Sequence, residues 1–307
     1  MILILVKQMV QMFLLAGVGF LLYKGGKITQ EGSKTLGNIL IYASLPAVII
    51  NGFRVERTAE HVSGILWSAA GALVLLLVSV LISHFVFRQD PIGTFAGAFS
   101  NPGFFGVPLM IASLGQGAVF YAASFIAFLN IGQWTYGVSR LNGQPLTEGL
   151  KLKKLIQAPF VIAILAGLFL FATQIPLPDV IVNCITTLAG LNTPLAMFTV
   201  GVFLAQTDFW KMFRKKELYL VSAVRLLLVP AVSLLLLSLL PADMAAMKMV
   251  LLIAVSCPVG SNVAVNVAVY AQLHGKNYPY AVETVIISTM LSILTIPLVV
   301  HFSTMIW

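Results

Sequence analysis

Long apolar stretches repeat along the whole sequence, and short clusters of charged residues, glycine and proline separate them. A helix needs about 20 apolar residues to cross a hydrocarbon layer roughly 30 Å thick. With the charges, glycines and prolines taken as boundaries, the pattern predicts ten membrane-spanning helices. They lie near residues 2–23, 33–53, 64–87, 92–113, 117–139, 157–174, 179–205, 217–240, 247–272 and 279–305.

The composition excludes an ordinary soluble protein. Of the 307 residues, 59% are hydrophobic and only 9% are charged, and the mean hydropathy is +0.99. Soluble domains carry about 25% charged residues, and their cores could not hold this much apolar sequence. We therefore expect an all-α integral membrane protein. The first apolar run lacks a small-residue cleavage site, so we interpret it as a span and not as a removable signal.

The basic residues give an orientation. The formal net charge is +8, but the Lys and Arg residues lie in short clusters between the apolar runs, which is typical of topology signals and not of nucleic-acid binding. Most of the 18 basic residues follow spans one, three, five, seven and nine. The other side has few, among them Arg54, Arg57 and Lys248. The basic side is then cytoplasmic, and both ends of the chain lie outside.

Three short matches indicate an internal duplication. Leu15, Ala16 and Gly17 recur as residues 165–167, and Pro46 of span two corresponds to Pro194 of span seven. The third match aligns Ala98, Ser100 and Pro102 with Ala254, Ser256 and Pro258.

The longest connection divides the chain into nearly equal halves. We expect a first five-helix repeat over residues 1–139, a cytoplasmic linker over residues 140–156 and a second five-helix repeat over residues 157–307. Because five is an odd number, the second repeat enters the membrane from the opposite side, which gives an inverted repeat.

Spans four and nine contain residues that interrupt helices. Each proline removes a backbone donor and clashes with the preceding turn, and the unpaired groups that result are tolerated in a membrane only against protein or water. In span four these residues are Asn101, Pro102, Gly103, Gly106 and Pro108. In span nine they are Pro258, Gly260, Ser261 and Asn262, which follow Cys257.

Interrupted spans at corresponding places in two halves indicate a substrate site near the middle of the membrane. The free amides and the dipole at each half-helix N-terminus favour a carboxylate there. In span five, Asn130 and Gln133 are three residues apart and share one helical face, where they could contact a ligand. The alternatives are that the prolines and glycines only kink or pack helices, and that the two amides only bond neighbouring helices.

One basic residue, Arg225, lies inside span eight, and an ionisable group there is first treated as functional. Spans eight and ten both begin at the cytoplasmic face, so we predict an ion pair between Arg225 and Glu283. The alternative is that Arg225 extends to the membrane surface. Apart from Glu283 no acidic residue lies deep in a span, which argues against a proton relay or a sodium site built from several carboxylates.

The stretch from Asn101 to Pro108 reads N-x-x-x-x-G-x-P. With the ten-span pattern, it resembles the auxin efflux carrier family, whose PIN-like members include bacterial relatives assigned to dicarboxylates such as malate or malonate. The resemblance covers essentially the full chain. It implies that spans four and nine cross near Pro102 or Pro108 and near Pro258, and that Asn101 contacts the ligand. Spans one, two, six and seven would form a scaffold, against which the others move.

The expected function is secondary transport of small organic anions across a bacterial inner membrane by alternating access. We expect no catalytic residue, metal, cofactor or nucleic-acid partner, whereas membrane lipid surrounds the protein and a homodimer through the scaffold helices is compatible with this arrangement. The alternatives are a sodium-coupled symporter of the bile-acid type, an intramembrane enzyme, and a receptor or channel. No metalloprotease motif supports an enzyme, and the cysteines, Cys184 and Cys257, do not form a redox motif.

Overall fold

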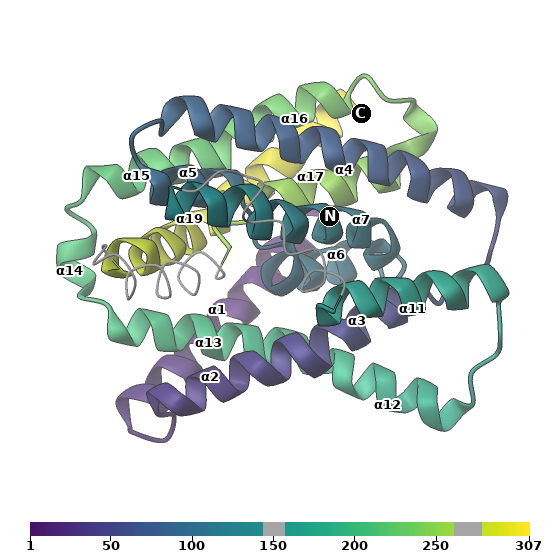
Figure 1. Ribbon diagram of the computed structural model, residues 1–307, viewed down its shortest axis with the longest axis horizontal. Helices are drawn as coiled ribbons and strands as arrows, with labels where there is room; N and C mark the ends of the chain where they lie inside the picture. The colour runs from purple at the N-terminus through teal and green to yellow at the C-terminus, as the bar shows by residue number, and fades with distance from the viewer. Residues whose placement is uncertain (144–156, 261–277) are drawn as a thin grey trace.

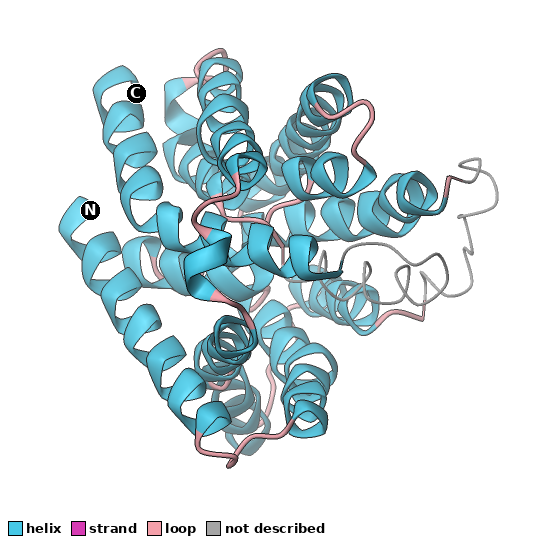
Figure 2. Ribbon diagram, turned by 90° about the vertical axis from the view of Figure 1, so that its left-hand side faces the viewer, coloured by secondary structure: helices cyan, strands magenta, loops and turns pink. Residues whose placement is uncertain are grey.

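The computed structural model describes residues 1–143, 157–260 and 278–307. Within these ranges the protein is all-helical, with one isolated antiparallel bridge and no β-strand (Figures 1 and 2). Short loops join the helices. The predictions for Ser261 and Asn262, and for most of the linker, concern residues outside these ranges.

The helices up to the linker, in chain order, are α1 (Ile2–Lys24), α2 (Gln30–Ile39), η1 (Leu40–Ser44), α3 (Leu45–Gly52), α4 (Ala59–Val86), α5 (Pro91–Ala98), η2 (Pro102–Gly106), α6 (Val107–Leu114), α7 (Ala118–Gly132), η3 (Gln133–Gly137) and α8 (Val138–Asn142). Those after it are α11 (Pro159–Thr173), α12 (Asp179–Gly190), α13 (Asn192–Gln206), α14 (Phe209–Met212), α15 (Lys216–Ala223), η4 (Val224–Leu228), α16 (Val229–Leu237), η5 (Ala242–Met244), α17 (Ala245–Ser256) and α19 (Tyr278–Ile306).

Six helical segments in the described ranges are long and apolar enough to cross a membrane. They are Ile2–Lys24, Gln30–Gly52, Ala59–Val86, Asp179–Gln206, Lys216–Leu237 and Pro279–Ile306. Two shorter apolar helices, Pro102–Leu114 and Pro159–Thr173, lie within other predicted spans. The all-helical membrane class is therefore found, whereas the count of ten crossings stays a prediction.

Local chemistry explains where several helices begin and end. The Thr29 side chain accepts a hydrogen bond from the Gly32 amide (3.0 Å), and the Thr58 side chain accepts one from the His61 amide (3.1 Å), so each caps a helix N-terminus. At the other end, Gly115 stops α6 with φ of +85°, a conformation that favours glycine.

Three helices widen into a π-turn just before a proline. Leu45 donates to the carbonyl oxygen of Leu40, five residues back, and the next residue is Pro46. The same arrangement precedes Pro108 after η2 and Pro230 after η4. A proline ring would clash with the carbonyl four residues back, and the wider turn removes that clash. These helices continue through their prolines instead of ending there.

The scaffold expected from the sequence contains a close helix pair. Helices α1 and α13 cross in direct contact, and α2 lies beside α13 (Figure 1). A Cβ atom on Gly201 would overlap the carbonyl oxygen of Ala16, and one on Gly19 would lie 2.6 Å from the Cα of Phe198. Two glycines thus let the backbones approach, as is common where membrane helices pack.

Candidate functional site

The first interruption lies between α5 and η2. Helix α5 ends at Ala98, Phe99 is extended (φ −112°, ψ 113°), and helical backbone resumes at Pro102. In the second half of the chain α17 ends at Ser256, and Cys257 is again extended (φ −60°, ψ 152°). Both helices stop among the prolines and glycines that the sequence singles out. The part of span nine beyond Gly260 lies outside the described residues.

The two extended stretches lie against each other. Ser100 and Val259 form an antiparallel bridge, and the Gly260 amide donates to the Phe99 carbonyl oxygen (3.1 Å). The Ser100 hydroxyl donates to the carbonyl oxygen of Ala254 (2.9 Å). Backbone groups that leave a helix inside a membrane must find partners in protein. Here each interrupted helix supplies partners to the other.

Helix α19 holds the second stretch from the other side. The Val259 amide donates to the hydroxyl oxygen of Ser288 (3.0 Å), and Ser288 is fully buried. Span ten therefore fixes the extended part of span nine with a side chain that the sequence analysis did not single out. A serine among apolar helix positions was the available signal.

Glycine is required where the stretches touch. A Cβ atom on Gly260 would lie 2.8 Å from the Ser100 carbonyl oxygen, and one on Gly106 would lie 2.8 Å from the Cys257 sulfur. Gly103 has more room, with Leu45 of α3 at 3.3 Å. Pro102, Pro108 and Pro258 are buried in the same region. The contact is thus built from small residues and backbone.

Asn101 lies at the first residue before the resumed helix and is half-buried. Its carbonyl oxygen accepts hydrogen bonds from the amides of Phe105 (3.0 Å) and Gly106 (3.2 Å). Among the described residues its side chain has no hydrogen-bond partner. The side-chain amide is therefore available to a ligand at the start of η2.

The two amides of span five differ. Gln133 is 1% exposed, and its Nε2 lies 3.5 Å from the position of a Cβ on Gly260, so it lies at the contact. Asn130 is half-buried and donates to the Ile126 carbonyl oxygen of its own helix (2.7 Å). The Asn130 side-chain nitrogen is thus bound to the backbone of its own helix, which favours a structural role for that nitrogen.

Asn192, which the sequence analysis missed, also reaches this region. It begins α13, is 2% exposed, and donates through Nδ2 to the Gly103 carbonyl oxygen (3.1 Å). Its Oδ1 has no partner among the described residues. The signal was its place next to Thr193 and Pro194, after Leu191, which separates α12 from α13.

The predicted ion pair between Arg225 and Glu283 is wrong. Arg225 is 0% exposed and donates to the carbonyl oxygens of Gly97 (3.0 Å), Ala98 (2.9 Å) and Val255, so it does not extend to the surface either. The partners of the guanidinium are thus carbonyl oxygens at the ends of α5 and α17.

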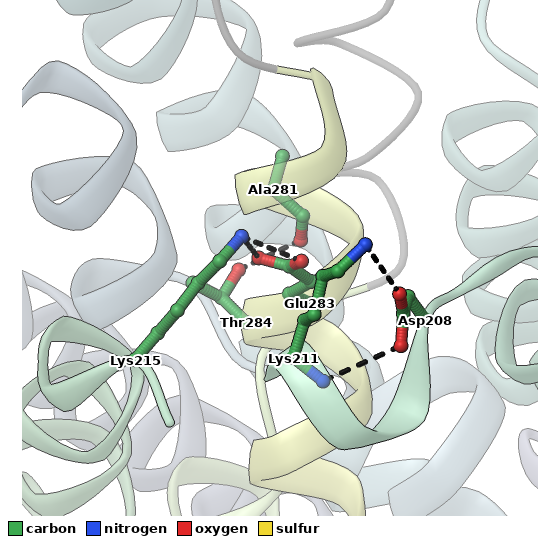
Figure 3. Close-up of polar contacts among 6 residues, drawn as sticks. All are labelled: Asp208, Lys211, Lys215, Ala281, Glu283 and Thr284. Atoms are coloured by element: carbon green, nitrogen blue, oxygen red, sulfur yellow. Dashed lines mark hydrogen bonds and ion pairs between the residues drawn. The ribbon is translucent and has the colours of Figure 1, made fainter. Parts of the chain in front are cut away.

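Glu283 has a different partner, Lys215, which precedes α15. The Lys215 ammonium donates to both carboxylate oxygens, at 2.7 and 2.6 Å (Figure 3). Helices α15 and α19 pack together. The lysine just before α15 can therefore reach the carboxylate about one turn inside α19. In the same view Lys211 pairs with Asp208 at 2.9 Å, and the hydrogen bond from the Lys211 side chain lowers the pKa of that exposed carboxyl.

No group of three or more potential metal-ligating side chains occurs in the described ranges. The site is instead made of backbone, amide and hydroxyl groups, with one buried guanidinium at its edge. Such a set can bind an anion through amide donors or a cation through carbonyl acceptors.

Two comparisons with known proteins indicate a membrane transport protein. The sequence profile described as "membrane transport protein" matches residues 4–148 and 145–300, which together cover nearly the whole chain. A protein of Rhizobium meliloti (strain 1021) described as "Putative malonate transporter" is 26% identical over an alignment of 298 residues, and the alignment covers 91% of each of the two chains.

Proposed function

Because this chain belongs to the membrane transport protein family, which includes the auxin efflux carriers, we propose that it is a secondary transporter of small organic anions. The substrate class is that of carboxylates such as malonate or malate, or of auxin-like acids. The name of the Rhizobium relative supports malonate as the first candidate. An integral membrane location follows from the family and from the apolar helices.

The observation that carries the proposal is the direct contact between two interrupted helices, through the bridge from Ser100 to Val259. Interrupted helices that meet inside a membrane protein are the usual place of a transporter's substrate site. The helical segment Pro102–Leu114 begins there. Pro102 has no N–H, and the amides of Gly103 and Phe104 come before Phe105, whose amide is the first to donate to the Asn101 carbonyl oxygen. We propose that a substrate carboxylate binds these amides and the Asn101 side chain.

The further ligand contacts are proposals as well. Gln133 and Asn130 would contact the substrate from span five, and Gly103, Gly106 and Gly260 would let backbone approach it. Pro102 and Pro258 would keep the two helices interrupted, and Pro108 would lie beside the site in the resumed helix. Ser261 and Asn262 would contribute from span nine, by their sequence position alone.

The architecture that we propose has ten spans in two inverted repeats, residues 1–139 and 157–307, with residues 140–156 as a cytoplasmic linker. Spans four and nine cross, and spans one, two, six and seven form the scaffold and a dimer contact. The basic loops face the cytoplasm of a bacterial inner membrane, and both ends of this sequence lie outside. Substrate access alternates as the remaining spans move against the scaffold.

Export would need no coupling ion. Moving one negative charge across 100 mV yields about 2.3 kcal/mol, which corresponds to roughly a fifty-fold gradient. A sodium-coupled symporter of the bile-acid type remains the second candidate, and a dependence of transport on sodium distinguishes it.

The test is counterflow of labelled malonate into proteoliposomes that are preloaded with unlabelled malonate, malate or an auxin-like acid. We expect saturable counterflow that falls about tenfold or more in Asn101→Ala, because a hydrogen bond to the charged substrate is lost. Asn142→Ala, which removes an amide at the end of α8, is the matched control and should keep wild-type flux.

Each outcome has a clear meaning. Flux that is linear with concentration would indicate a channel and not a carrier. No flux with any of these acids would sink the substrate class, and strict sodium dependence would favour the symporter.

A further inference from the structure

Helices α5 and α17 end at the same place, and both point their C-termini at one side chain. Gly97 and Ala98 are the last residues of α5, and Val255 lies in the last turn of α17. The carbonyls in the last turn of a helix lack intrahelical donors, and each helix C-terminus carries about half a negative charge. The carbonyl oxygens of these three residues accept hydrogen bonds from the Arg225 guanidinium.

This guanidinium is fully buried, and a buried charge needs compensation. Within the described ranges the carboxylates that form ion pairs are Asp208 and Glu283, and lysines hold both. Two helix C-termini, at about half a negative charge each, together offset about one positive charge. The counter-charge of Arg225 is thus the pair of helix ends.

Half-helix C-termini and unwound carbonyls are also the groups that bind coupling cations in secondary transporters. We infer that the carbonyls of Gly97, Ala98 and Val255 form a latent site for a monovalent cation, which the Arg225 guanidinium fills in this protein. The cation site is argued from the geometry alone. Its link to ion coupling rests on the proposed transport function. Arg225 is a positioning residue, because its contacts are with the two helix ends.

The π-turn of η4 is what brings Arg225 to this place. Arg225 is its second residue, and Val229 donates to the Val224 carbonyl oxygen five residues back. The extra residue in the turn rotates the helix locally, and π-turns recur at functional sites for this reason. The Nε of Arg225 has no partner among the described residues, so only the fork of the guanidinium is engaged.

The test measures the Tm of the purified full chain in detergent, because it requires no knowledge of the substrate. Arg225→Ser empties the carbonyl site, and Arg214→Ser removes an equal charge from an exposed loop as the control. Each protein is melted at equal ionic strength in choline, sodium, potassium or methylguanidinium chloride. We expect sodium or methylguanidinium to raise the Tm of Arg225→Ser by several degrees relative to choline, with no such rise in wild type or Arg214→Ser.

A Tm of Arg225→Ser that is the same in all four salts would overturn the inference, and so would an equal rise in the wild type. If Arg225→Ser gives no folded protein, Arg225→Lys and Arg225→Met decide. A cation site predicts more folded monodisperse protein from the lysine variant. More from the methionine variant, or none from either, would overturn the inference. A lack of malonate flux would leave these results unchanged, so the two proposals fail separately.

Discussion

At the scale of single residues, the helix breakers were readable from the sequence and their partners were not. Proline and glycine impose their effect on the backbone locally, so the interruptions near Pro102 and Pro258 could be predicted. The partners of Arg225 are carbonyl oxygens, which every residue has, so no sequence pattern could indicate them. Glu283 was the expected partner because of its charge, but Lys215 binds that carboxylate.

Gly260 gives a direct test of the contact between the interrupted helices. In Gly260→Ala the new Cβ would meet the Ser100 carbonyl oxygen at 2.8 Å, and backbone cannot move aside as a flexible side chain can. We expect a loss of about 1–3 kcal/mol in stability and a marked loss of flux. Thermal unfolding and counterflow measure the two effects.

Gly190→Ala is the control for this variant, because a Cβ on Gly190 meets nothing within 4 Å. It should melt and transport as the wild type does. Equal behaviour of the two alanine variants would mean that the helices are not in close contact at Gly260.

At the scale of helices, hydropathy predicted where the helices lie better than it predicted whether each helix runs unbroken. Span two continues through Pro46, because a π-turn precedes this proline. In span seven, Leu191 separates α12 from α13 but keeps helical backbone angles (φ −72°, ψ −16°), three residues before Pro194. Whether a proline breaks a helix depends on the turn before it, which neighbouring helices stabilise, and so the single sequence does not decide it.

The pair formed by α1 and α13 gives a prediction at this scale. Gly201→Ala places a methyl group on the backbone of α1 at Ala16, and the helices would have to separate. We expect a loss of about 1–3 kcal/mol or more, measured by thermal unfolding in detergent.

The control lies on α1 itself. Gly17→Ala adds the same methyl group where nothing lies within 4 Å. If Gly17→Ala destabilised the protein as much as Gly201→Ala does, helix propensity or lipid contact would be responsible and not the packing of the two helices.

At the scale of the whole molecule, the sequence was enough to predict an all-helical membrane protein. Apolar composition reflects the membrane environment and does not depend on how the helices are arranged. The inverted arrangement and the orientation rest on loop charges and short matches, and they stay predictions. Asn192 was not predicted, because its hydrogen bond to Gly103 joins two helices that are distant in sequence and meet only in the fold.

Orientation can be tested with an impermeant maleimide on intact bacterial cells. In a Cys184→Ser background, Asp243→Cys should be labelled from outside, whereas Lys211→Cys should require permeabilised cells. Both positions are exposed, and Cys257 is fully buried and should stay unlabelled. The reverse labelling pattern would show that the topology is inverted. Labelling of both positions from outside would show that the chain does not cross the membrane once between them.

The contact between Gly19 and Phe198 also has a consequence for biosynthesis. The partner of the first helix is made about 180 residues after it. At about 5–20 residues per second, roughly 10–40 s pass before α13 leaves the ribosome. During that time the face of α1 that carries Gly19 can meet only lipid, the insertion machinery or another nascent chain. Slower translation would lengthen the interval in which α1 can bind a partner other than α13.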